Sequence, residues 1–435
     1  MESADRAAGP RLNRLRSLVA GVSCGLAILC STLLPNEFAI AENWPQFRGA
    51  DGSGVSSEKG IPASWSQGDY LWDVAIDGSG HGAPVVWGDH LFVTSADDDG
   101  AVRLLACLDA TTGKPRWSQS IGMNRSKPQN QKGSHASSTP ATDGERVYVM
   151  FADKENYLVA AYDFAGALQW RRRLGSFESQ HNLGVSPIVV DDLLIVCNDQ
   201  DGPSSIFAFD KKTGATRWVT PRAFRGQSTS YSTPIVLREL NQPPQLICAS
   251  GPLGISSLDL KTGTPLWHSG EFPLRTVASP VFGGGLLIAS CGQGGRYGVL
   301  QVAVDPKSLD ENGMAKVVWK REKMIPYVPT PIIHGDYLFD WTDEGIIACV
   351  DLKSGKDVWV KRLGGMISSS LLCIDGKIYG VQDSGKVTVI EAGPEFKELG
   401  NADLGEGSYS TPAIANGRLY LRTFSRLKCL QATKI

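Results

Sequence analysis

Short apolar runs alternate with turn residues along most of this chain. In one typical unit, Pro187 opens an apolar run at 188–190, Asp191 and Asp192 form a turn, and a second run follows at 193–197. A loop then leads to a third run, and a further turn leads to a fourth. Short apolar runs bounded by Gly, Pro and Asp are typical of strands. The pattern therefore predicts four antiparallel strands per unit of about 40–50 residues, which is the size of a propeller blade.

The third and fourth strands of the unit share a motif: a small residue, an apolar residue, Asp, a short turn ending in Gly, and then Trp. Its five copies are centred on Asp109, Gly113 and Trp117; Asp163, Gly166 and Trp170; Asp210, Gly214 and Trp218; Asp259, Gly263 and Trp267; and Asp351, Gly355 and Trp359. Asp accepts hydrogen bonds from nearby amides, and Gly adopts the left-handed conformation of a tight hairpin. We expect each Trp to be structural and to pack against the next blade, since one sheet cannot bury both of its faces.

Counting the first strands gives the number of blades. Seven openings carry a proline: Pro84, Pro140, Pro187, Pro234, Pro280, Pro331 and Pro412. An eighth opening lies at 368–373, with Leu371 where proline would stand. In the fifth unit an insertion at 306–315 separates Asp305 from Trp319. The sequence therefore predicts an all-β, eight-bladed β-propeller that occupies 42–435 as a single domain.

The last unit has room for only three strands before the chain ends. The missing strand is available at 70–76, so we expect an N-terminal strand to complete the last blade and close the ring. Closure removes open sheet edges. Residues 43–68, which include Trp44, Phe47 and Trp65, are expected to pack along the outside.

Composition agrees with this fold and adds a location. The chain has 42% apolar residues, 48 glycines and 24 prolines, and its formal net charge of −2 gives no reason to expect nucleic acid as a partner. Arginines precede an apolar run at 18–34, and small residues follow at 39–41. This layout predicts a secretory signal peptide at 1–41, and hence export to the periplasm or cell envelope. The apolar run is also long enough for an uncleaved anchor, which would be the protein's only membrane contact.

The repeat, small-x-Asp-x-x-Thr-Gly-x-x-x-Trp, resembles that of the pyrroloquinoline-quinone (PQQ) dehydrogenases and of their non-catalytic relatives. The relatives include the BamB-type lipoprotein of outer-membrane assembly. The segments at 44–49, 326–329 and 391–396 also resemble PQQ-like repeat proteins of planctomycete-type bacteria. The resemblance covers residues 43–435 and implies the fold of the quinoprotein alcohol dehydrogenases.

Resemblance to the dehydrogenases would also imply oxidation of an alcohol or sugar by PQQ, held on a divalent cation in the central channel above a disulfide between adjacent cysteines. No two cysteines are adjacent in this chain, and no position matches a cation ligand or the catalytic base. We therefore assign no catalytic residue and expect no required cofactor, with PQQ kept as the alternative. Cys107, Cys349 and Cys429 fall at the small-residue position of the repeat, where a thiol serves as a small buried hydrophobe.

The loops before each first strand should gather with the second-to-third-strand loops on one face around the channel. Candidate binding residues on that face are His81, His135, His181, Arg125, Arg225, Arg275, Tyr231, Tyr327 and Tyr409. The three histidines could bind zinc or copper, but no carboxylate or cysteine spacing supports a metal site. Cations, with Lys132, Arg222 and Arg321 among them, would form either a basic mouth for an anion or a mixed solvated surface. Tyrosines at such a rim suit protein contacts.

These observations favour an exported, monomeric, non-catalytic module that binds or scaffolds an envelope protein through its loop face. Two alternatives stay open: a divergent PQQ-dependent dehydrogenase acting on alcohols or sugars, and a ligand-sensing propeller that signals through a partner.

Overall fold

The computed structural model describes residues 43–433 apart from 126–131, 227–228 and 293–297. The chain divides into two units, Met1–Ile40 and Ala41–Ile435. The predicted signal peptide, 1–41, lies outside the described residues. In the part of the chain that is described, no helix has the length and apolar character needed to cross a membrane.

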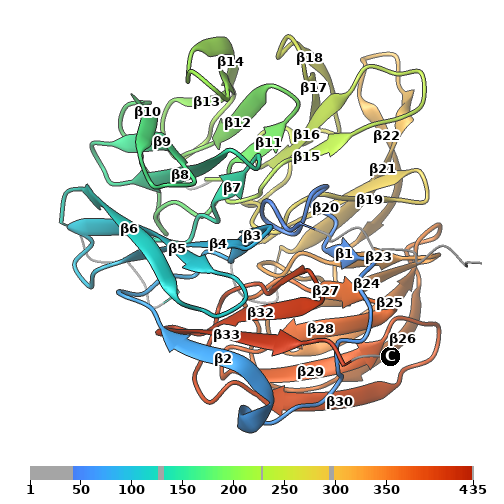
Figure 1. Ribbon diagram of the computed structural model, residues 1–435. Coiled ribbons are helices and arrows are strands. Elements are labelled where there is room, and N and C mark those ends of the chain that lie inside the picture. The colour runs from blue at the N-terminus through green and yellow to red at the C-terminus, as the bar shows by residue number, and fades with distance from the viewer. Residues whose placement is uncertain (1–42, 126–131, 227–228, 293–297, 434–435) are drawn as a thin grey trace, which may run out of the picture. The chain divides into compact units, whose positions relative to one another are not determined.

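Eight sheets build the unit Ala41–Ile435, as predicted, and we number them as blades in chain order (Figure 1). Blades 1 and 2 consist of β3 (Val85–Trp87), β4 (His90–Ala96), β5 (Val102–Asp109) and β6 (Pro115–Gly122), and of β7 (Ala141–Thr142), β8 (Arg146–Ala152), β9 (Tyr157–Asp163) and β10 (Leu168–Arg173). Blades 3 and 4 consist of β11 (Ile188–Val190), β12 (Leu193–Asn198), β13 (Ser204–Asp210) and β14 (Thr216–Arg222), and of β15 (Ile235–Leu237), β16 (Gln245–Ser250), β17 (Gly254–Asp259) and β18 (Pro265–His268).

The second half repeats this plan with two additions from the N-terminal end. Blades 5 and 6 consist of β19 (Val281–Gly283), β20 (Leu286–Cys291), β21 (Leu300–Leu309) and β22 (Ala315–Arg321), and of β23 (Ile332–His334), β24 (Tyr337–Trp341), β25 (Ile346–Asp351) and β26 (Asp357–Arg362). Blade 7 consists of β27 (Leu372–Ile374), β28 (Lys377–Val381), β29 (Lys386–Glu391) and β30 (Glu398–Asp403), joined by β1 (Val55–Ser56). Blade 8 consists of β31 (Ala413–Ala415), β32 (Arg418–Arg422) and β33 (Arg426–Gln431), completed by β2 (Tyr70–Ala75).

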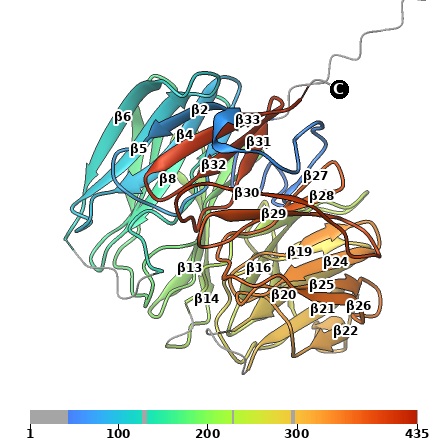
Figure 2. The same ribbon diagram turned by 90° about the horizontal axis from the view of Figure 1, so that it is seen from below.

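The ring closes where sequence analysis placed its closure. β2 pairs antiparallel with β33 as the fourth strand of blade 8. Innermost strands of neighbouring blades contact one another at β3 and β7, β7 and β11, β19 and β23, and β23 and β27, and β3 of blade 1 contacts β31 of blade 8. Figure 2 shows β5 and β6 on one side of the unit, with β22 and β26 on the opposite side. The eight-bladed, all-β prediction is therefore confirmed.

The outer hairpins of blades 1 to 4 and of blade 6 use the turn chemistry of the repeat. In blade 1, Oδ1 of Asp109 accepts the amides of Thr111 and Thr112 at 3.0 and 2.8 Å, and Gly113 has φ +70°. A register shift follows beside Trp117. A bulge of this kind redirects a side chain out of the plain sheet alternation.

The structure places the repeat tryptophans against the next blade. Trp117 donates its indole N–H to the carbonyl of Phe164 at 2.8 Å, and a Cβ on Gly166 would lie 2.9 Å from the same indole ring. The same indole-to-carbonyl bond joins Trp72 to Ala110, Trp170 to Lys211, Trp218 to Leu260, Trp319 to Leu352 and Trp359 to Gly393. Trp267 instead bonds Gln245 of its own blade. The insertion of blade 5, which extends β21 and β22, replaces the short turn that Trp267 would otherwise meet.

The prediction that residues 43–68 pack along the outside is wrong for its first half. Residues 44–56, here called the plug, lie against the innermost strands instead. Trp44 forms an isolated bridge with Val86 of blade 1, the carbonyl of Pro45 accepts the amide of Thr142, and Oε1 of Gln46 accepts the amide of Val189. The plug thus pairs with backbone groups on the inner edges of blades 1, 2 and 3.

Arg48 fastens the plug on the far side of the channel. Its guanidinium donates to the carbonyls of Thr330, Leu371 and Pro331 at 3.1, 2.8 and 2.7 Å, and to the carbonyl of Gly52 at 3.3 Å. Burial lowers the pKa of Arg48 to about 9. The plug therefore touches blades 1, 2, 3, 6 and 7, and it closes one end of the channel.

The second half of the N-terminal segment does lie outside, as predicted. Ser64 accepts the amide of Asn401, and Gln67, in the short 3-10 helix η1 (Gln67–Asp69), bonds the carbonyl of Asp403 at 2.5 Å. Both partners lie on β30, the outer strand of blade 7.

Candidate functional site

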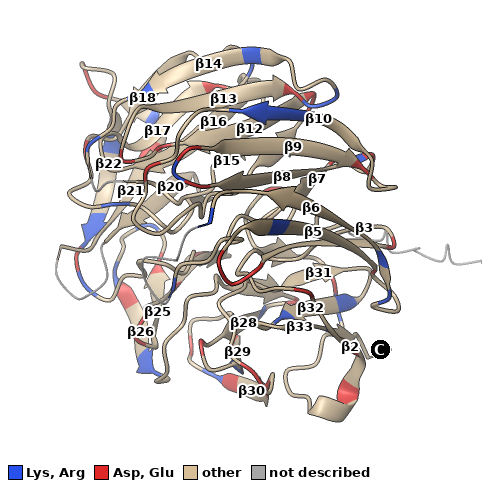
Figure 3. Cartoon of the chain, turned by 90° about the vertical axis from the view of Figure 1, so that its left-hand side faces the viewer, with Lys and Arg blue, Asp and Glu red and all other residues tan. Residues whose placement is uncertain are grey.

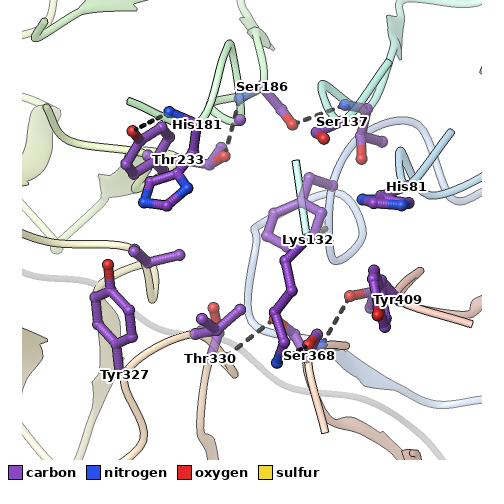
Figure 4. A pocket seen from close by; sticks show the side chains of 18 residues that line it. His81, Lys132, Ser137, His181, Ser186, Thr233, Tyr327, Thr330, Ser368 and Tyr409 are labelled. Carbon is purple, nitrogen blue, oxygen red and sulfur yellow. Dashed lines mark hydrogen bonds between the residues drawn. The ribbon is translucent and has the colours of Figure 1, made fainter. Parts of the chain in front are cut away.

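The open end of the channel holds a cavity of about 230 Å³. Its walls come from the loop that leads into the first strand of each blade, here called the entry loop, and all eight blades contribute. Phe47 of the plug also lines it. We call the side chains around its opening the channel mouth: His81, Lys132, His181, Tyr231, Tyr327 and Tyr409 (Figure 4).

A chain of hydroxyl groups, here called the belt, links the entry loops below the mouth. In blades 1 to 7 the residue before the opening proline, or before Leu371 in blade 7, donates its amide N–H to the hydroxyl of the equivalent residue in the next blade. The donor–acceptor distances are 2.9–3.2 Å. The belt residues are Thr139, Ser186, Thr233, Ser279, Thr330, Ser370 and Thr411. Ala83 of blade 1 begins the belt as a donor but has no hydroxyl, so the belt is interrupted between blades 8 and 1.

Two histidines of the mouth each lie edge-on to a tyrosine. The ring centroids of His81 and Tyr409 are 4.8 Å apart, and those of His181 and Tyr231 are 5.8 Å apart. Burial, and then the charge of Arg422, lowers the pKa of His81 to about 4. Burial is also the larger cause of the lowered pKa of His181. Both imidazoles are therefore neutral at pH 7 and act as hydrogen-bonding aromatic groups.

Lys132 spans the mouth. It belongs to the entry loop of blade 2, yet its ammonium donates to the hydroxyl of Ser368 at 3.0 Å and lies 3.3 Å from Oδ2 of Asp383. The same ammonium lies 5.8 Å from the ring centroid of Tyr409. Figure 4 shows the side chain crossing the cavity toward Ser368. The lysine thus connects blade 2 with blades 7 and 8.

Tyr231 and Tyr327 are anchored by their surroundings. The hydroxyl of Tyr231 bonds Oγ of Ser179 at 2.7 Å and accepts the amide of His181 at 3.2 Å. Oδ2 of Asp343 accepts the amide of Tyr327 at 2.8 Å, and burial raises the pKa of this carboxyl to about 6.

The remaining predicted residues lie outside the cavity lining. His135 is buried, with Nδ1 3.3 Å from Nη2 of Arg103. Arg275 is also buried, behind the mouth tyrosines. Arg125 is 80% exposed and pairs with Asp99 at 3.3 Å, and Arg225 bonds the carbonyl of Phe272 at 3.0 Å. His81, His135 and His181 do not meet, and no group of three metal-ligating side chains occurs among the described residues.

The sequence left open either a basic mouth or a mixed solvated surface for its cations, and two of these cations belong to neither. Arg222 and Arg321 end β14 and β22 as buried side chains paired with Asp199 and Asp340. Figure 3 shows Lys- and Arg-bearing segments interspersed with Asp- and Glu-bearing ones over the side that it presents. These arginines join strands within and between blades, because a strand end places its side chain at a blade face and not on the loop.

Sequence reasoning missed Phe47 and the belt. A Ser or Thr precedes every opening proline except Pro84, which follows Ala83, and this recurrence was the signal for the belt. Nothing in the sequence distinguishes Phe47, which lines the cavity, from Trp65, which lies in the outer half of the N-terminal segment.

The cavity lining does not fit PQQ held on a divalent cation. Among the described residues no carboxylate lines the cavity, although cations of this kind prefer oxygen ligands with negative charge. The described cysteines, all buried and none in a disulfide, include no adjacent pair on which a quinone could stack. We therefore derive no chemistry through that group.

Comparison with known proteins identifies the family of the chain. A family model described as outer membrane protein assembly factor BamB matches residues 56–152 and 103–361, together more than half of the chain. The tetrathionate hydrolase of Acidithiobacillus ferrooxidans is 25% identical over 246 residues, which are 52% of this chain and 44% of that protein. The chain thus matches less than half the length of this curated relative.

Two solved structures share the fold. BamB from Moraxella catarrhalis superposes with a TM-score of 0.60 at 15% identity, over 83% of this chain and 99% of that one. Quinohemoprotein alcohol dehydrogenase from Comamonas testosteroni gives 0.66 at 13% identity, over 90% and 80%. The propeller fold and the extent of the family match lead to one assignment: this chain belongs to the BamB family of PQQ-like repeat β-propellers.

Proposed function

We propose that this chain is an exported, non-catalytic propeller that binds a partner protein of the cell envelope at its channel mouth. The description of its family as an outer membrane assembly factor supports this role. The signal-peptide pattern at 1–41 supports export to the periplasm or envelope.

The observation that carries the proposal is the asymmetry of the channel. The plug closes one end, and the other end is ringed by partly exposed aromatic side chains from different blades, among them Tyr327 and Tyr409. Tyrosine is enriched in protein interfaces because it combines a large apolar face with a hydroxyl. The belt holds the entry loops in register, so a partner would meet a preorganised surface and lose little loop entropy on binding.

The chemistry of the lining also favours binding over catalysis. Its histidines are neutral at pH 7, and its hydroxyls accept hydrogen bonds from backbone amides. In the part of the lining that the structure describes, no carboxylate can orient a histidine or hold a cation. Such a lining recognises shape and hydrogen-bonding groups.

Site-specific photo-crosslinking in the native envelope tests this role. Tyr409 is replaced by a photo-reactive phenylalanine analogue, and Val358 on the exposed outer strand β26 is replaced in the same way as the matched control. We expect a discrete protein adduct from position 409 and none from 358. Equal adducts at both positions, or none at 409, would contradict a partner site at the mouth.

A second assay addresses the rival enzyme. Purified protein is supplied with PQQ and calcium, and dye reduction is followed with alcohols and aldose sugars. The proposal expects no saturable turnover. Turnover that saturates with substrate and depends on PQQ would overturn the non-catalytic assignment.

A further inference from the structure

The belt leaves a set of unused hydrogen-bond donors in the cavity. Six belt residues line it: Thr139, Ser186, Thr233, Thr330, Ser370 and Thr411. A hydroxyl has one hydrogen to donate and can accept through its oxygen. Each of these oxygens accepts a backbone amide of the preceding blade. Among the described residues, none of the six hydroxyl hydrogens has an acceptor, so all six remain to serve a ligand.

These donors are fixed before any ligand arrives. The amide from the preceding blade holds each oxygen in place, as the bond to Ser186 and the bond from the Thr330 amide to Ser370 illustrate (Figure 4). The six oxygens therefore stay fixed around one cavity, and each hydroxyl hydrogen can turn toward a ligand there. Preorganised donors bind developing or permanent negative charge without a further cost of reorganisation.

Two buried arginines near the cavity add positive charge, and Asp201 partly offsets the one beside His181. Arg422 is 1% exposed, its Nε and Nη2 have no partner among the described residues, and its charge acts on His81 of the lining. Arg275, 8% exposed, has an unpartnered Nε, and its charge acts on His181. These two arginines belong to blade 8 and to the entry loop of blade 5.

Nearby carboxylates do not cancel this charge. Asp383 pairs with Lys132, which neutralises both groups, and Asp343 is bonded by the amides of Tyr327 and Val328. Neither aspartate lines the cavity. A buried cation without a counter-ion is costly, and an anion in the cavity would offset that cost.

We propose that this cavity is a binding site for a small oxyanion group, whose oxygens accept hydrogen bonds from the belt hydroxyls. The ligand class comprises carboxylates, phosphate and sulfate. The group arrives either as a free anion or as an acidic side chain of a bound segment. The site goes beyond the proposed protein-binding role and does not depend on it.

Calorimetric titration of the full chain at low ionic strength tests the site with acetate, sulfate and phosphate. Acetamide, which has the shape of acetate without its charge, is the matched control ligand. We expect saturable binding of acetate or of one of the inorganic anions and at least tenfold weaker binding of acetamide. Acetamide binding equal to that of acetate, or no binding of any anion, would overturn the proposal.

Variants separate the belt from a general charge effect. Thr411→Val removes a donor at almost constant volume, and Thr411→Ser keeps it. We expect affinity to fall on the order of tenfold in the valine variant, the usual worth of a hydrogen bond to a charged group, and to stay within about twofold in the serine variant. Arg275→Met leaves the belt intact and should also weaken binding, so the proposal is still tested if the valine variant folds poorly. Unchanged affinity in folded Thr411→Val or in Arg275→Met contradicts the site.

One more ligand distinguishes a free anion from an acidic side chain of a bound segment. An N-acetylated aspartyl tripeptide with an amidated end is titrated beside acetate. Binding more than tenfold tighter than that of acetate assigns the group to an acidic segment of a partner, and weaker binding assigns it to a free anion. Loss of the cross-linked partner with retained anion binding would contradict only the proposed function.

Discussion

Replacing Thr233 by valine measures what one link of the belt contributes to stability. Thr233 is 4% exposed, and its hydroxyl accepts the amide of Ser186, itself 2% exposed, at 3.1 Å. Valine has nearly the same volume and leaves that amide without an acceptor. An unsatisfied buried donor costs about 1–3 kcal/mol, so we expect a loss of about 2 kcal/mol. For a domain of about 390 residues this corresponds to a fall of roughly 2–3 °C in Tm.

Calorimetry and urea unfolding give the loss, and hydrogen exchange of the peptide that contains Ser186 shows whether the amide becomes less protected. Thr233→Ser keeps the acceptor and loses only a methyl group, worth about 0.8 kcal/mol. Thr216→Val, at an exposed position on β14, controls for the substitution itself and should stay within about 0.5 kcal/mol of the parent.

The order of the variants decides the outcome. If the belt hydroxyls join the blades, Thr233→Val is less stable than Thr233→Ser, and the Ser186 amide exchanges its hydrogen faster in the valine variant. A valine variant as stable as the parent, or more stable than Thr233→Ser, would refute the idea that the belt hydroxyls join the blades.

Three further predictions concern other parts of the ring. Ala83→Ser supplies an acceptor for the amide of Thr411 at the interruption of the belt. It should raise the free energy of unfolding in urea by about 1 kcal/mol. An unchanged or lower value would show that the belt cannot be continued there. Gly263→Ala places a Cβ 2.5 Å from the ring of Trp218 at φ +73° and should lower the free energy of unfolding by more than 2 kcal/mol. Gly313 has the same φ with open space around it, so Gly313→Ala should lower it by about 1 kcal/mol. Equal losses in the two variants would contradict the packing of Gly263 against the tryptophan. Burial, and then a nearby arginine, lowers the pKa of His81 from 6.5 to about 4. The unfolded chain therefore binds the proton at a higher pH than the folded protein does, and stability falls as the pH drops from 6.5 to about 4. The loss is about 2 kcal/mol at pH 5, and His81→Gln should remove it from the difference between urea unfolding at pH 7 and pH 5.

The ring itself could be predicted because its signals are local. The Asp-to-Gly turn and the alternating apolar runs determine each blade within about 45 residues, and the incomplete last blade identifies 70–76 as its missing strand. These features depend on hydrogen bonds between residues two to four positions apart, as at Asp109.

The plug and the mouth could not be predicted in the same way because their contacts join distant parts of the chain. Arg48 bonds carbonyls more than 280 positions away, and Lys132 reaches Ser368 across the channel. Arg222 was assigned to the loop face by its position after a strand, but its partner Asp199 lies 23 positions earlier and draws it into the blade. The sequence alone does not show whether a side chain at the end of a strand lies in the face of the blade or on the loop.

The pairing of β2 with β33 also has a consequence for the order of biosynthesis. Blade 8 joins a strand at 70–75 to one at 426–431, so the circle cannot be completed before both strands have left the ribosome. Until β33 has been synthesised, β2 has no antiparallel partner in its blade. Closure of the ring therefore waits for β33 and not for the blades made before it.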